Sequence, residues 1–132
     1  MSRAHSSPSL LIRLCALALW AATLAYLSLA SNVRPPSGPL GWDKLHHFSA
    51  YAVLAALLLF VLSAQRALSG RILFAAWLTC FGYGLLLELL QWAMAAGRCF
   101  ELADLFANGL GALLACLFCV LFRHGRRVAS QS

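Results

Sequence analysis

The chain has 132 residues, of which 62% are hydrophobic and 11% are charged, and its formal net charge is +6. Soluble domains are roughly 45–50% apolar, so this composition excludes a soluble globular protein and predicts one integral domain in a lipid bilayer. The basic residues are dispersed at the ends of apolar segments instead of lining an aromatic-interleaved face, so nucleic acid is not expected as a partner.

The first apolar segment, residues 14–30, follows a basic head at residues 1–13. Its 17 uncharged residues, extended by a snorkelling Arg13, predict a membrane-spanning helix. Ser28-Leu29-Ala30 also resembles a signal-peptide cleavage site, so removal of this segment remains an alternative. Residues 31–44 contain three prolines and two glycines, which predict an irregular loop on the outer side.

Three further apolar runs predict spanning helices at residues 45–65, 72–94 and 102–122. No segment has the composition or alternation typical of a strand. The predicted fold is therefore all-α, an integral membrane four-helix bundle. It forms a single domain over residues 14–122, followed by a basic tail at residues 123–132.

The distribution of Lys and Arg predicts the orientation of the chain. Seven basic residues lie in the head, the second connection and the tail, whereas three lie on the opposite side. This bias predicts that both termini are cytoplasmic. The seven are Arg3, Arg13, Arg66, Arg71, Arg123, Arg126 and Arg127, and the three are Arg34, Lys44 and Arg98.

Polar residues recur at one depth in the outer half of the predicted bundle. Tyr51, Glu88 and Asn108 each lie six residues from the outer end of a helix, roughly 9 Å below the interface. A charge at the centre of a membrane costs at least ~2.5 kcal/mol, so such groups usually face a protein interior and indicate function. We therefore expect an inward-facing polar pocket.

Helical spacing places the remaining polar residues on the same faces. A stripe of small residues on the last helix also predicts a close helix contact. The residues that share one helix face are Asp43, His47 and Tyr51; Glu88 and Gln91; and Asp104, Asn108 and Gly111. The small residues of the stripe are Ala103, Ala107, Gly111, Ala115 and Cys119.

The motifs of the second to fourth helices resemble the VanZ-like family of small bacterial membrane proteins. They are Asp43-Lys44-x-x-His47-Phe48-x-x-Tyr51, Glu88-x-x-Gln91, Arg98 and Asp104-x-x-x-Asn108-x-x-Gly111. The resemblance implies a four-helix integral membrane protein of the cell envelope, in the bacterial cytoplasmic (inner) membrane. Through the founding member, it also implies a link to antibiotic resistance, against the glycopeptide teicoplanin. It implies no mechanism, because the family has no settled biochemical activity.

The predicted pocket has acid–base and anion-binding candidates but no reaction-specific signature. His47, Glu88 and Asp104 are the catalytic candidates, because each can exchange a proton. Lys44 and Arg98 would hold a phosphate or carboxylate. Neither a metal nor another cofactor is expected, because the ligands would come from separate helices without HxxxH or HxxE spacing. The full set of ligand-binding candidates is Asp43, Lys44, Tyr51, Gln91, Arg98 and Asn108.

Two classes of function fit these residues. The leading hypothesis is an outward-facing pocket that binds a lipid-linked or cell-envelope component. The alternative is a non-enzymatic membrane factor that packs on partner proteins or forms a homo-oligomer. In that case Glu88 would only tie helices together, and Asp104 would be a helix-terminal charge, as Glu101 is expected to be. Arg98 would pair with Glu88 or Asp104. Proton-coupled transport is disfavoured, because the inner halves of the helices offer mainly Ser63, Thr79 and cysteines.

The predicted orientation places Cys99 outside, whereas the other four cysteines lie within spans. A membrane-impermeant maleimide should therefore label intact spheroplasts at Cys99, and Cys99→Ser should remove the label. Labelling of Ser130→Cys from outside would instead show the reverse orientation.

Overall fold

The computed structural model describes residues 8–30, 42–65, 67–94 and 101–129. These residues form four helices and, within those ranges, no strand, which confirms the all-α prediction. The helices are α1 (Pro8–Leu29), α2 (Trp42–Ser63), α3 (Gly70–Ala93) and α4 (Leu102–Ala129).

All four helices are long and apolar enough to cross a membrane. Their apolar stretches contain 21–24 residues with mean hydropathies between 1.8 and 2.3. At a rise of about 1.5 Å per residue, 21 residues extend roughly 31 Å, close to the thickness of a bilayer core. The prediction of four membrane-spanning helices is therefore confirmed.

The helices begin and end at positions that differ from the sequence prediction. Trp42, Asp43 and Lys44 form the first turn of α2, so assigning them to the loop at residues 31–44 was wrong. Similarly, α1 begins at Pro8 and α4 continues to Ala129. The physical reason is that a charged residue ends an apolar run without ending a helix, and an acidic residue is favoured in a first turn.

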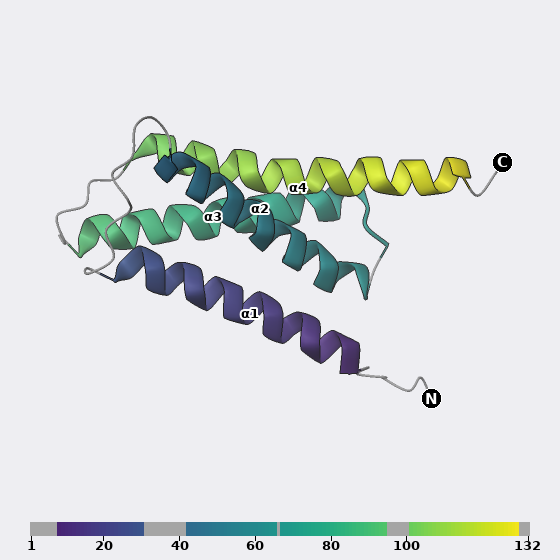
Figure 1. The fold of residues 1–132 in the computed structure, drawn as a ribbon, viewed down its shortest axis with the longest axis horizontal. Helices are drawn as coiled ribbons and strands as arrows, with labels where there is room; N and C mark the ends of the chain where they lie inside the picture. The colour runs from purple at the N-terminus through teal and green to yellow at the C-terminus, as the bar shows by residue number, and fades with distance from the viewer. Residues whose placement is uncertain (1–7, 31–41, 66, 95–100, 130–132) are drawn as a thin grey trace.

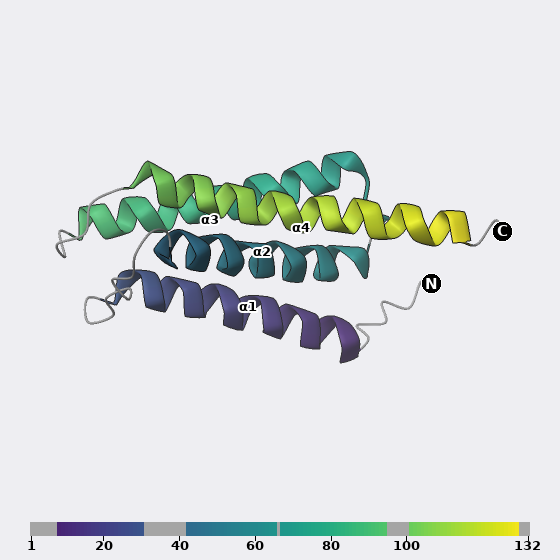
Figure 2. The same cartoon turned by 45° about the horizontal axis from the view of Figure 1, so that its top comes forward.

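The helices alternate in direction along the chain, so α2 and α4 run parallel to each other and antiparallel to α1 and α3 (Figure 1). One end of the bundle holds the last residues of α1 and α3 and the first residues of α2 and α4. We call it the site end. Within the described ranges, α1 packs on α2 and α3 and makes no contact with α4 (Figure 2). The most extensive helix pair is α2 with α4.

The backbones of α2 and α4 approach closely at Gly111. A Cβ atom at this position would lie 1.9 Å from the carbonyl oxygen of Phe48, a distance at which the two helices would have to separate. Ala107, one turn earlier, is also buried, whereas Ala103 is exposed. The predicted close contact of small residues is thus confirmed at Gly111.

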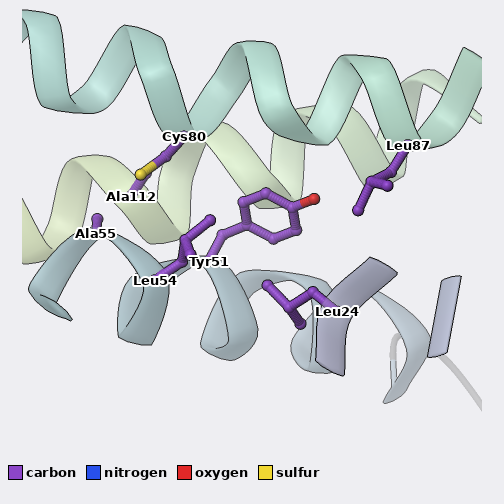
Figure 3. Packing of buried hydrophobic residues seen from close by; sticks show 7 residues of the cluster. All are labelled: Leu24, Tyr51, Leu54, Ala55, Cys80, Leu87 and Ala112. Atoms are coloured by element: carbon purple, nitrogen blue, oxygen red, sulfur yellow. The ribbon is translucent and has the colours of Figure 1, made fainter. Parts of the chain in front are cut away.

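The apolar core below the site end is built by all four helices (Figure 3). Tyr51 of α2 lies at its centre, with its hydroxyl directed between Leu24 of α1 and Leu87 of α3. Many large side chains, among them Phe74 and Phe118, are instead exposed on the surface, as expected where lipid surrounds the bundle. The core residues are Leu24, Tyr51, Leu54, Ala55, Cys80, Leu87 and Ala112.

Hydrogen bonds to backbone carbonyls attach α1 to the other helices. Trp20 Nε1 donates to the carbonyl oxygen of Ala50 at 3.0 Å, and the Tyr83 hydroxyl donates to that of Ala21 at 2.7 Å. Because apolar contacts alone discriminate poorly between helix partners in lipid, such bonds help to fix the position of α1.

The contact at Gly111 generates a stability prediction with a matched control. Gly111→Ala should destabilise the bundle by about 1–3 kcal/mol, because the added methyl group overpacks the α2–α4 contact. Gly82→Ala should be neutral or stabilising by up to about 1 kcal/mol, because a Cβ there meets nothing within 4 Å. Thermal unfolding in detergent measures both, and equal melting temperatures would contradict the close contact.

Candidate functional site

Polar side chains gather at the site end despite the apolar composition of the helices. Glu88 of α3 and Asp104 and Asn108 of α4 are buried, with residue exposures of 3%, 7% and 1%. The first two turns of α2 add three polar residues beside them. We call the whole set the polar cluster, and it consists of Asp43, Lys44, His47, Glu88, Glu101, Asp104 and Asn108.

Lys44 connects the beginning of α2 to the beginning of α4. Its ammonium group donates to Glu101 Oε2 at 2.5 Å and to Asp104 Oδ1. Asp43 Oδ2 lies 3.6 Å away. The two α4 partners differ in environment, because the Asp104 side chain is 10% exposed and that of Glu101 is 54% exposed. The Lys44–Asp104 bond is therefore the better shielded from water.

His47 is oriented by an amide on α4. Its Nδ1 lies 3.1 Å from Asn108 Oδ1, and because an amide oxygen only accepts, the tautomer with a proton on Nδ1 donates a hydrogen bond here. The opposite ring nitrogen, Nε2, faces Asp43 Oδ1 at 3.8 Å and Asp104 Oδ2 at 3.7 Å. The imidazole is thus placed between a neutral acceptor on one side and two carboxylates on the other.

The Asn108 side chain fits between α4 and α3 because Gly84 of α3, which lies opposite it, has no side chain. A Cβ at Gly84 would lie 2.9 Å from Asn108 Nδ2 and 3.1 Å from the ring of Tyr51. Tyr51 and Asn108 therefore both lie against Gly84, one turn of α3 before Glu88. Sequence analysis missed Gly84, although its position four residues before Glu88 places both on one face of α3.

Glu88 interacts with the beginning of α4. The backbone N–H of Glu101 donates a hydrogen bond to the Glu88 carboxylate, which is close enough to His47 and Asp104 to interact with their charges. The first N–H groups of a helix have no partner within the helix and carry partial positive charge. A carboxylate is therefore well placed at this terminus, which explains how an acidic group is accommodated in an apolar helix.

Not every predicted site residue joins the polar cluster. Gln91 Nε2 donates to the carbonyl oxygen of Ser28 at 2.6 Å, so this side chain connects α3 to α1. Tyr51 is 4% exposed and belongs to the apolar core beneath the polar cluster. Arg98 lies outside the described residues. Glu101, considered only as a helix-terminal charge from the sequence, instead bonds to Lys44.

A family model described as VanZ/LLP1 matches residues 4–123. The chain belongs to the VanZ/LLP1 family. The resemblance found in the second to fourth helices is confirmed, and the family match also includes α1. Together with the four apolar helices, it identifies a VanZ-type multi-pass membrane protein. No curated protein and no solved structure matches the chain.

Part of the VanZ-like motif has the composition of a metal-ligand set. Asp43, His47 and Asp104 can each offer one ligand atom, and these atoms lie within 4.8 Å of one another. The expectation that no metal binds rested on the lack of HxxxH or HxxE spacing. However, Asp43 and His47 are four residues apart, and this spacing brings two ligand types to one face of a helix.

Asp104 and Glu101 both accept from Lys44 but differ in exposure, and equivalent substitutions in this VanZ-like protein compare what each bond contributes to stability. Asp104→Asn should lower stability by about 1–3 kcal/mol, because a charge-assisted bond is weakened where water is largely excluded. Glu101→Gln should cost less than about 1 kcal/mol, because that side chain is solvent-exposed. Chemical denaturation in detergent compares the two, and a larger loss for Glu101→Gln would contradict the assignment.

Proposed function

We propose that the polar cluster is a pocket at the outer face of the bacterial cytoplasmic membrane, where it binds a lipid-linked or cell-envelope component. The observation that carries this proposal is a partly exposed His47, with a side-chain exposure of 21%, surrounded by buried acidic and amide groups. Ionisable groups in membrane spans are costly to insert and mark functional sites by default. The Asp43 side chain is 36% exposed, so the polar cluster is accessible from the side of Asp43.

The charges of the polar cluster suggest how such a ligand is held. Lys44 binds a phosphate or carboxylate, and Arg98 is proposed as a second cation. Since Lys44 already bonds to Glu101 and Asp104, an anionic ligand replaces the more exposed partner, Glu101. His47 has the group best placed to exchange a proton with the ligand, because its Nε2 faces the open side near Asp43.

Family membership supports a role in the cell envelope and, as part of this proposal, in tolerance of the glycopeptide teicoplanin. A ligand with a polyprenyl or acyl tail would already be present in the bilayer. Its anionic headgroup would then reach the polar cluster at the first turns of α2 and α4. Lipid-resolved mass spectrometry of the gently extracted protein would identify a co-purifying ligand of this kind.

One set of contacts favours a second candidate, a non-enzymatic membrane factor. Gln91 connects α3 to α1, Lys44 connects α2 to α4, and the Glu101 N–H connects α4 to Glu88 of α3. Each bond joins a different pair of helices. In addition, every buried side-chain N or O atom in the described part of the chain has a partner. A purely structural network would have these properties.

Two conservative substitutions separate the candidates. Glu88→Gln and His47→Gln keep much of the hydrogen-bonding capacity but remove the proton-exchanging group. If the polar cluster acts on a ligand, each variant should accumulate normally in the membrane and lose glycopeptide tolerance on expression. The double variant should be little worse, because groups that act as a unit are strongly non-additive.

The matched control is His46→Gln, which changes an exposed histidine next to His47 on α2 and should keep full tolerance. Membrane abundance is measured by quantitative immunoblot beside the resistance assay. Full tolerance in both single variants would refute the pocket, and loss of tolerance that follows loss of protein would support the structural candidate.

A further inference from the structure

The two aspartates of the polar cluster each divide their oxygens between two partners. One oxygen of Asp104 accepts from Lys44, and its other oxygen faces His47 Nε2 at 3.7 Å. Asp43 repeats this arrangement, with Oδ2 at 3.6 Å from Lys44 Nζ and Oδ1 at 3.8 Å from His47 Nε2. The carboxylates thus define two adjacent cation positions, and the Lys44 ammonium occupies one of them.

The second position has the geometry of a metal-ligand set. Distances of 3.7 and 3.8 Å are too long for hydrogen bonds from Nε2. Around a tetrahedral ion with ligand bonds of about 2.0–2.1 Å, neighbouring ligand atoms lie about 3.4 Å apart. The three ligand atoms, all within 4.8 Å of one another, therefore need only a small contraction to surround an ion.

The charge balance of the described side chains also favours a divalent ion. Asp43, Glu88, Glu101 and Asp104 contribute four negative charges when ionised, and Lys44 contributes one positive charge. An excess of negative charge therefore remains at the end of an apolar bundle. A divalent cation would offset two of these charges.

The surroundings of His47 match those of known metal-binding histidines. Such histidines almost always donate their second ring N–H to an oxygen acceptor, which fixes the tautomer and the ring orientation. Here Asn108, which is 1% exposed, provides that acceptor. Gly84 leaves the space in which the Asn108 amide lies.

We propose that Asp43, His47 and Asp104 bind one divalent transition-metal ion of the zinc type. One imidazole nitrogen and two carboxylate oxygens are suitable donors for such an ion. Three protein ligands leave a further coordination position for water or an anionic oxygen, as in catalytic zinc sites. Both proposals use His47 Nε2, so a bound ion would replace the proton exchange proposed above, whereas absence of the ion would leave the envelope-ligand proposal intact.

The test measures metal bound to the purified full-length chain in detergent after removal of any affinity tag. The protein is stripped with a chelator, dialysed against equal concentrations of Zn²⁺, Mn²⁺ and Mg²⁺, and analysed by inductively coupled plasma mass spectrometry. We expect one Zn²⁺ per chain. Substitution with Co²⁺ should give d–d absorption bands without thiolate charge transfer, because the ligands are nitrogen and oxygen.

Three variants test the ligand assignment. His47→Gln and Asp43→Asn should weaken Zn²⁺ binding at least tenfold, whereas His46→Gln should bind like the wild type. Asn108→Ala keeps all three ligands and should weaken binding about 10–100-fold through the orientation of His47. Circular dichroism and size-exclusion chromatography restrict the comparison to folded protein.

Several outcomes would overturn the metal site. These are the absence of stoichiometric Zn²⁺, binding of Mg²⁺ alone, binding unchanged in His47→Gln, or a thiolate charge-transfer band from a cysteine site. Because His47 is partly exposed, His47→Gln is expected to fold, so the test does not depend on the buried Asn108. No added lipid or glycopeptide is used, so a negative result leaves the proposed envelope ligand untouched.

Discussion

The close backbone contact between Phe48 of α2 and Gly111 of α4 determines how the rest of the bundle is arranged. Because the two helices are parallel, a contact at one level fixes the pairing at every level toward the site end. On α4, Asn108 lies one turn from the contact and meets His47, and Asp104, one turn further, meets Lys44. A larger residue at Gly111 would push α2 and α4 apart and so separate both pairs, although the paired residues themselves would be unchanged. The glycine therefore determines whether the polar residues of the motif can meet.

The polar cluster follows from this pairing together with one contribution from α3. The parallel arrangement brings the first turns of α2 and α4 to the same end, where the unpaired N–H groups of α4 accommodate an acidic side chain. Glu88 takes that place from α3, and Gly84 gives Asn108 room beside it. The same contacts thus hold three helices together and leave His47 partly exposed, which is why stability and ligand binding must be measured side by side.

The sequence predicted the spans and the inward polar faces well, because apolar length and helical spacing are local properties. The close contact at Gly111 was predicted for the same reason. The sequence could not show which neighbouring helix each polar face meets, so the bond from Gln91 to α1 and the role of Gly84 were not foreseen. Glu101 was also underestimated, since its partner Lys44 is distant in the chain and only tertiary packing brings them together.

The attachment of α1 has a consequence for how sequences of this kind diverge. Tyr83 and Gln91 of α3 bond to carbonyl oxygens of α1, which every residue carries regardless of its side chain. Most residues of α1 need only form a helix that is apolar enough for lipid. Substitutions there are therefore expected to be nearly neutral away from Trp20, which donates to Ala50, and Leu24, which packs in the core.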